Sequence, residues 1–334
     1  MTESTERPSE RARRSAAPAL RWAWALIVGG VLGLAVVVPV SVWTHLGQRA
    51  DERSRWSVAL PADLRETLWV WLEQVSVPLI VLVTVSAAVV ALVRRRPEQA
   101  LAAALLVGAA NVTTQLAKSL LPRAYYGIGA ENTLPSGHMT VVVSLLAAVV
   151  LVLPRPLRLP MVGIASFVST LAGATIVILR WHRPSDVVAA VGVCAFWYGV
   201  AVLVAHPWAQ RRRWREAEAG PPAHEVRAPG AHREGHEWDD AARAVEAARP
   251  WRDRIVPYAV LALASGALSG VVLILGGLAA HEKPSNAAVG AIALSAAGLA
   301  VAGLMSMGAS AADGLDAPAR PHAPGHEPAQ EPSV

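Results

Sequence analysis

The tetrapeptide Pro135–His138 (PSGH) stands directly before a long apolar run, at the point where a helix would begin. The first N–H groups of a helix have no partner within the helix, and they form a site for anions. Gly137 has no side chain to keep an anion from the backbone, while Ser136 and His138 add a hydroxyl and an imidazole. These residues predict a phosphate-binding turn that carries a histidine.

His182 and Asp186 are four residues apart, a spacing that places two side chains on one face of a helix. A carboxylate beside an imidazole fixes its tautomer and makes it a better base or nucleophile. Two other interpretations stay open. The pair could be half of a metal site, although only His138 and Glu131 are available as further ligands, or a polar cap at the start of an apolar helix.

Lys118 and Arg123 lie at the end of another apolar run, in the segment KSLLPR. Both cations could hold the same anion as the PSGH turn. A lysine at the edge of an apolar helix costs a few kcal/mol unless it reaches the membrane surface, so Lys118 indicates either a site or snorkelling.

The elements that must position these groups are membrane helices. The chain of 334 residues is 54% hydrophobic and only 16% charged, which is typical of membrane proteins. Most of the apolar stretches reach the ~20 residues that a transmembrane helix needs. The stretch His138–Leu153 is shorter, and we expect its helix to begin earlier, at Ser136 or Gly137. The eight predicted spans are Trp22–Trp43, Leu68–Val93, Leu101–Leu121, His138–Leu153, Met161–Leu179, Val187–Ala205, Ile255–Ala280 and Ala287–Met307.

The positive charges predict the orientation. With the N-terminus in the cytoplasm, 21 of the 30 Lys and Arg residues fall in inside segments, which follows the positive-inside rule. Both termini are then cytoplasmic, and the three polar clusters meet on the extracytoplasmic face of the cell membrane. The basic excess orients the protein and contacts membrane lipids, so no nucleic-acid partner is expected.

The predicted fold is an all-α polytopic membrane bundle, with a six-helix core followed by a two-helix hairpin. The hairpin is rich in small residues, with Gly266 and Gly270 in a spacing that lets helices approach closely. It would pack against the first six spans or form a homodimer with a second copy. The predicted divisions are a disordered tail (1–21), the core (22–205), a charged cytoplasmic linker (206–254), the hairpin (255–308) and a second disordered tail (309–334).

The order of motifs, Lys118 with Arg123, then PSGH, then His182-xxx-Asp186, resembles the integral-membrane type 2 phosphatidic acid phosphatase family. Members are six-span enzymes that remove phosphate from lipid phosphates and diphosphates without a metal or other cofactor. The resemblance covers roughly residues 60–205. It implies a substrate whose tail stays in the bilayer, such as a polyprenyl diphosphate, phosphatidic acid or phosphatidylglycerol phosphate.

The resemblance also implies a role for each matched residue. His182 would attack phosphorus and form a phosphohistidine while Asp186 holds its other nitrogen, and His138 would protonate the leaving group. The residues that would hold the phosphoryl oxygens are Lys118, Arg123, Ser136 and Gly137.

Two departures from the family pattern bear on activity. The first motif is shorter, with four residues between Lys118 and Arg123 in place of six. The third motif has Ile176 where the family has arginine, and Arg180 could replace it if the segment before His182 is extended. The expected activity is a metal-independent lipid phosphatase. The alternatives on the same fold are a phosphotransferase and a weakened or inactive enzyme that binds lipid phosphates.

Overall fold

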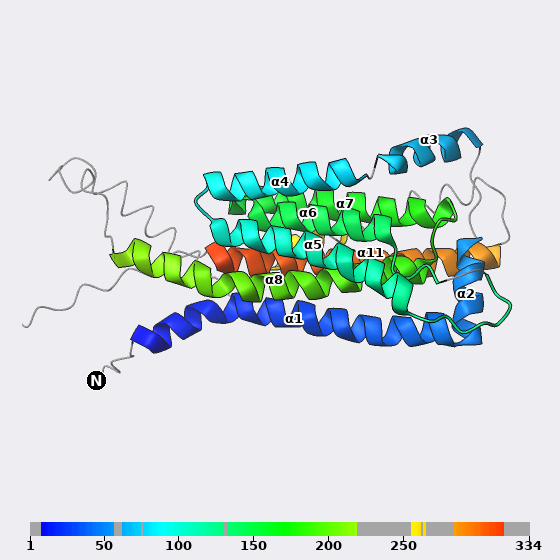
Figure 1. Ribbon diagram of the computed structural model, residues 1–334, viewed down its shortest axis with the longest axis horizontal. Helices are drawn as coiled ribbons and strands as arrows, with labels where there is room; N and C mark the ends of the chain where they lie inside the picture. Colours follow the sequence, from blue (N-terminus) through cyan, green and yellow to red (C-terminus); the bar gives the residue numbers. More distant parts are fainter. Residues whose placement is uncertain are drawn as a thin grey trace, which may run out of the picture.

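A computed structural model of the chain describes residues 8–56, 62–74, 76–129, 132–218, 255–261, 263–264 and 284–316. Within these ranges the regular elements are all helices, as the sequence predicts, and most run side by side in an elongated bundle (Figure 1). The helices are α1 (Pro8–Trp43), α2 (His45–Arg55), α3 (Ala62–Glu73), α4 (Val77–Val93), α5 (Pro97–Leu120), α6 (Gly137–Val152), α7 (Arg155–Ile178), α8 (Pro184–Glu218) and α11 (Pro284–Asp316).

Among the described residues, five helices are long and apolar enough to cross a membrane. They are the apolar parts of α1, α5, α7, α8 and α11. The bent pair α3 and α4 is a sixth candidate, with an angle of 58° between its halves. The predicted span Leu68–Val93 is therefore interrupted, and Pro78 in the first turn of α4 favours the break because it lacks an N–H.

Helix α6 begins at Gly137, as predicted, and has only 16 residues. At 1.5 Å per residue it is about 24 Å long, shorter than a hydrocarbon core of ~30 Å. Ser136 caps its start, and Pro154 follows its end. Because α6 is this short, the predicted span His138–Leu153 is not among the five helices long enough to cross a membrane.

The helical part of the chain extends beyond the predicted divisions at both ends. Helix α1 starts at Pro8, inside the segment 1–21 that the sequence predicts to be disordered. Helix α11 continues to Asp316, past the predicted end of the hairpin at residue 308. Ion pairs from the buried Arg158 to Asp313 and Asp316 hold this extra length against α7. Helix α8 similarly continues through the first residues of the predicted linker.

Several predictions fall on residues outside the described ranges. They concern most of the linker (219–254), most of the predicted span Ile255–Ala280 with its pair Gly266 and Gly270, and the candidate metal ligand Glu131.

Helices α8 and α11 lie at the centre of the bundle. Helix α11 packs against α1, α6, α7 and α8, and the apolar side chains of its second half are buried. The hydroxyl of Tyr198 on α8 donates a hydrogen bond to the carbonyl of Gly308 on α11 at 2.9 Å. The sequence left two packing partners open for the C-terminal hairpin, the first six spans or a second copy of the chain. In the structure, α11, which contains the second predicted helix of the hairpin, packs against helices of the first six spans.

Helix α1 packs closely along α8 (Figure 1). A Cβ atom at Gly30 would lie 2.6 Å from the carbonyl oxygen of Gly192, so only glycine allows this approach of the two backbones. The contact fixes α8, which carries Asp186, against the N-terminal helix.

Helix α2 lies across one end of the bundle (Figure 1), where α5 ends and α6 and α8 begin. The side-chain amide of Gln48 donates to the carbonyls of Val42 and Ala124 at 2.7 and 2.8 Å. The indole of Trp43 donates to the carbonyl of Pro122 at 3.0 Å. These bonds attach the segment after α5, which contains Arg123, to the end of α1 and to α2.

Candidate active site

The first turn of α6 has the structure that the PSGH motif predicts. The hydroxyl oxygen of Ser136 accepts a hydrogen bond from the N–H of Met139, so Ser136 is the N-cap of the helix. The N–H groups of Gly137 and His138 precede the first intrahelical bond and are the donors available to an anion. Ser136 is fully buried, while Gly137 and His138 are partly accessible.

His182 and Asp186 form the predicted pair. The Nδ1 atom of His182 lies 3.1 Å from Oδ2 of Asp186, and both side chains are buried. A bond at Nδ1 makes that nitrogen the donor and leaves the lone pair on Nε2, the other ring nitrogen. His182 therefore has the tautomer that a nucleophilic imidazole needs.

Asp186 also caps α8, so the interpretation of the pair as a helix cap is correct as well. Its Oδ2 atom accepts from the backbone N–H of Arg183 at 3.0 Å and from the hydroxyl of Thr133 at 2.6 Å. A carboxylate in the first turn that bonds back to the residue before the helix is a recognised start signal. One side chain thus starts the helix and orients the imidazole.

The two histidine motifs are joined through the backbone. The N–H of Ser136 donates to the carbonyl of Asp186 at 2.9 Å. His138 is close enough to His182 and Lys118 for their charges to interact. The structure therefore brings together the predicted acid, the predicted nucleophile and one predicted cation.

Lys118 and Arg123 approach this cluster from the end of α5. The Nζ atom of Lys118 would lie 3.3 Å from a Cβ atom added at Gly137, so the ammonium faces the PSGH turn and the glycine leaves it room. Burial, together with the nearby positive charge of Arg183, lowers the pKa of Arg123 from its usual value. The Nη2 atom of Arg123 is buried and has no hydrogen-bond partner within the described part of the chain. A buried, unpaired guanidinium nitrogen is suited to receive an anion.

The segment that carries Arg180 differs from the one assumed for it. Its φ of 65° is left-handed, so the assumption of an extended segment before His182 is wrong. The N–H of Arg180 bonds to the carbonyl of Val177, and that of Trp181 bonds to the carbonyl of Ile176, which together form the Schellman end of α7. The Arg180 guanidinium lies over the ring of Trp56, 4.0 Å from its centroid.

Ile176, the other departure from the family pattern, is fully buried. It belongs to the same apolar cluster as Met139 and Val187, which follow His138 and Asp186 in sequence. A fully buried apolar side chain therefore occupies the position where the resemblance implies a cation.

Arg183 is a residue that the sequence analysis did not single out. Its side chain is almost fully buried, with Nε 3.0 Å from Oε2 of Glu52 and Nη1 2.9 Å from the hydroxyl of Thr133. Thr133 in turn donates to Asp186. Glu52 is 131 residues away in sequence, so no local pattern could have revealed this ion pair.

Asp51 of α2 was missed in the same way. Its carboxylate accepts hydrogen bonds from the backbone N–H of Ser185, at 3.1 Å, and from the Ser185 hydroxyl. Asp51 and Glu52 of α2 therefore bind Ser185 and Arg183, which lie between His182 and Asp186 in the chain.

Trp181 gives the site an apolar wall. Its ring centroid is 5.0 Å from that of His138 and 4.7 Å from that of Trp69 on α3. The imidazole of His138 thus packs against Trp181, which in turn packs against Trp69.

The described residues contain no group of three or more His, Cys, Asp or Glu side chains arranged to hold a metal ion. Cys194, the only cysteine of the chain, is buried within α8.

Residues 75–211 match the PAP2 superfamily. The matched segment includes all eight predicted site residues and overlaps most of the stretch 60–205 on which the resemblance rests. No curated protein and no solved structure matches the chain. Residues 75–211 are therefore a PAP2 superfamily domain, carried by a chain with several helices suited to span a membrane.

Proposed function

We propose that the chain is a PAP2-type membrane phosphatase that hydrolyses a lipid phosphate or lipid diphosphate through a phosphohistidine at His182. The observation that carries the proposal is the contact between His182 Nδ1 and the buried carboxylate of Asp186, because it leaves Nε2 as the nucleophilic nitrogen. Membership of the PAP2 superfamily supports the same reaction class.

In the first step, Nε2 of His182 attacks phosphorus, and the bond from phosphorus to the leaving oxygen breaks. His138 donates a proton to that oxygen as it leaves. In the second step, water attacks the phosphohistidine, the P–N bond breaks, and His138 takes the proton from the water. Inorganic phosphate is released, and both histidines return to their starting states.

Three groups would stabilise the phosphoryl oxygens in the transition state. They are the ammonium of Lys118, the unpaired Nη2 of Arg123 and the N–H groups at the start of α6. Trp181 and Trp69 would shield the reacting atoms from bulk water on the side of α3.

The proposal places the site at the extracytoplasmic face of the cell membrane. The clustered arginines at Arg94–Arg96 and Arg211–Arg213 lie at the opposite end of the bundle, and positive charge collects on the cytoplasmic side of membrane proteins. The lipid tail of the substrate would then remain in the bilayer while its phosphate enters the turn of α6.

A second candidate is a lipid-phosphate binder with little or no catalytic activity. Ile176 favours it, because an apolar side chain occupies the position of the family's third-motif arginine. Losing one group that stabilises the transition state can cost a factor of roughly 10²–10³ in rate.

Phosphate release by the purified full-length chain, in detergent with EDTA, separates these candidates. The substrates would be a polyprenyl diphosphate, phosphatidic acid and phosphatidylglycerol phosphate, compared for wild type, His182→Gln and the control His45→Gln. His45 is an exposed histidine at the same end of the bundle. We expect release by wild type and by His45→Gln, and its loss in His182→Gln.

Equal rates in wild type and His182→Gln would refute the phosphohistidine. Saturable lipid-phosphate binding without release would support the binder instead. Appearance of the phosphate on a second lipid, in place of free phosphate, would identify a phosphotransferase.

A further inference from the structure

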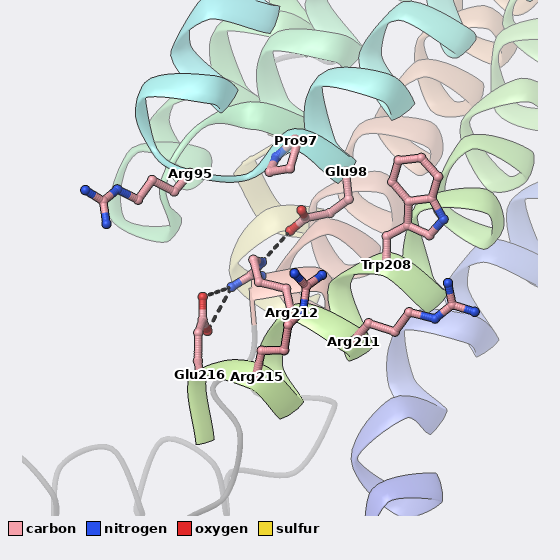
Figure 2. Close-up of a pocket in the computed structure, with 8 residues that line it drawn as sticks. All are labelled: Arg95, Pro97, Glu98, Trp208, Arg211, Arg212, Arg215 and Glu216. Atoms are coloured by element: carbon pink, nitrogen blue, oxygen red, sulfur yellow. Dashed lines mark hydrogen bonds and ion pairs between the residues drawn. The ribbon is translucent and has the colours of Figure 1, made fainter. Parts of the chain in front are cut away.

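A pocket of about 620 Å³ lies at the end of the bundle opposite the candidate active site, between the start of α5 and the extension of α8 (Figure 2). Its lining residues are Arg95, Pro97, Glu98, Trp208, Arg211, Arg212, Arg215 and Glu216. The phosphatase proposal uses none of them.

The lining has an excess of positive charge that the structure does not neutralise. Arg212 pairs with both acidic residues, with Glu98 at 2.9 Å and with Glu216 at 2.7 Å. Arg95, Arg211 and Arg215 are exposed and have no acidic partner among the described residues.

Arg212 itself retains an unused donor. Its Nη2 atom is buried and has no hydrogen-bond partner within the described ranges, although its other two nitrogens bind the glutamates. Buried guanidinium nitrogens are normally paired, so this atom indicates room for an acceptor oxygen from outside the protein.

Helical spacing brings the arginines of α8 together. Trp208, Arg211, Arg212 and Arg215 recur at three- and four-residue spacing, so they share one face of α8. Arg95 lies in the short turn between α4 and α5, and Figure 2 shows its guanidinium directed away from the arginines of α8. Figure 2 shows the guanidinium of Arg215 near that of Arg212, with Trp208 and Arg211 beside them.

The surroundings of the pocket are those of a membrane–water boundary. Trp208 is 51% exposed, and tryptophan prefers the headgroup level of a bilayer. One turn deeper into the bundle, Val204 on α8 and Leu101 on α5 also expose apolar side chains. A ligand at this place would contact arginines with its head and apolar side chains with its tail.

We propose that this pocket binds the phosphate headgroup of an anionic phospholipid from the leaflet opposite the candidate active site. Clusters of arginine next to a membrane helix are the features that recognise anionic headgroups, and planar guanidinium groups bind phosphate oxygens in pairs. The acyl chains lie along the exposed apolar side chains of α5 and α8. This site is separate from the proposed reaction and does not depend on it.

Calorimetric titration of the delipidated full-length chain, in a neutral detergent at fixed low salt, tests the site. The probes are dioctanoyl phosphatidylglycerol, dioctanoyl phosphatidylcholine and inorganic phosphate. We expect saturable binding of phosphatidylglycerol that depends on Arg211 and Arg215, no such binding of phosphatidylcholine, and weaker binding as salt is added. Each arginine near an anionic headgroup strengthens binding severalfold, so Arg211→Gln with Arg215→Gln should weaken it roughly 30-fold.

Two further variants make the result decisive. Arg49→Gln with Arg53→Gln removes the same charge from exposed positions on α2, at the other end of the bundle, and should bind like wild type. Arg211→Lys with Arg215→Lys retains the charge but loses the paired hydrogen bonds of guanidinium, so it should bind more weakly than wild type and more tightly than the glutamine variant, which a misfolded variant would not.

Unchanged phosphatidylglycerol binding in the glutamine variant would overturn the proposal. Equal affinity for phosphatidylcholine would show that the arginines do not select the headgroup. Tight binding of inorganic phosphate that weakens as much as lipid binding in the glutamine variant would overturn the lipid assignment in favour of a soluble anion.

Discussion

The carboxylate of Asp51 accepts hydrogen bonds from both the backbone N–H and the hydroxyl of Ser185, so a side chain of α2 caps the first turn of α8. Asp186 follows Ser185 directly and holds His182. The position of the proposed nucleophile therefore depends on a helix that lies outside the PAP2 match.

The pH dependence of stability should reveal Asp51. Burial, together with the nearby Asp186 carboxylate, raises the pKa of Asp51 to about 6. The folded state then binds more protons than the unfolded state between pH ~4 and ~6, so stability falls as pH rises through this window, by up to about 3 kcal/mol. We expect wild type to lose melting temperature relative to Asp51→Asn from pH 4 to 7.

Melting curves at constant ionic strength measure this difference, with Asp63→Asn, an exposed aspartate of α3, as the control. A difference between wild type and Asp51→Asn that stays constant with pH would mean that Asp51 does not titrate as stated.

Arg123 and Arg180 should differ sharply in their effect on phosphate release. Arg123 has a buried, unpaired nitrogen near the site, whereas Arg180 lies over Trp56. Arg123→Ala should lower kcat by a factor of roughly 10²–10³, and Arg180→Ala should leave it nearly unchanged. Initial rates at saturating substrate test this, and a large loss in Arg180→Ala would restore the assignment made from sequence.

Glu52 and Arg183 should behave as a coupled pair. Burial opposes ionisation of Glu52, but the hydrogen bond from Trp56 and the charge of Arg183 outweigh it, so the pKa of Glu52 lies below its usual value. In a double-mutant cycle with Glu52→Gln and Arg183→Gln, we expect a coupling energy of about 0.5–3 kcal/mol. The cycle is measured by thermal unfolding and by kcat. Strictly additive effects on both quantities would show that the ion pair does not position the site.

Arg158 should be far more important for stability than Arg155, although both pair with Asp313. Arg158 is fully buried with Nη1 2.6 Å from Asp313, while Arg155 is 39% exposed at 3.6 Å. Arg158→Met removes the fully buried partner of Asp313 and Asp316, whose ion pairs with other arginines are longer, and should cost about 3–5 kcal/mol. Arg155→Met should cost less than about 1 kcal/mol. Melting temperatures in one detergent give the order, and equal shifts would contradict it.

Local features of the site could be predicted from sequence because they depend on spacing over a few residues. The start of α6 at Gly137 follows from the capping serine before it, and the contact of His182 with Asp186 follows from the helical spacing of four. Both rules act within one helical turn, so distant parts of the chain do not alter them.

Features that depend on distant contacts could not be predicted in this way. Asp51 and Glu52 look like ordinary surface charges in HLGQRADERSR, and only the folded chain brings them to Ser185 and Arg183. The left-handed turn at Arg180 gave no signal either, since glycine is the usual residue there.

Helix α11 adds a constraint that concerns how the protein is made. The ribosome completes α5 to α8, with every candidate site residue, before it reaches Pro284 at the start of α11. Until α11 arrives, the faces of α1, α6, α7 and α8 that it covers lack their native neighbour. These helix faces therefore remain uncovered during synthesis, and the insertion of α11 completes the bundle.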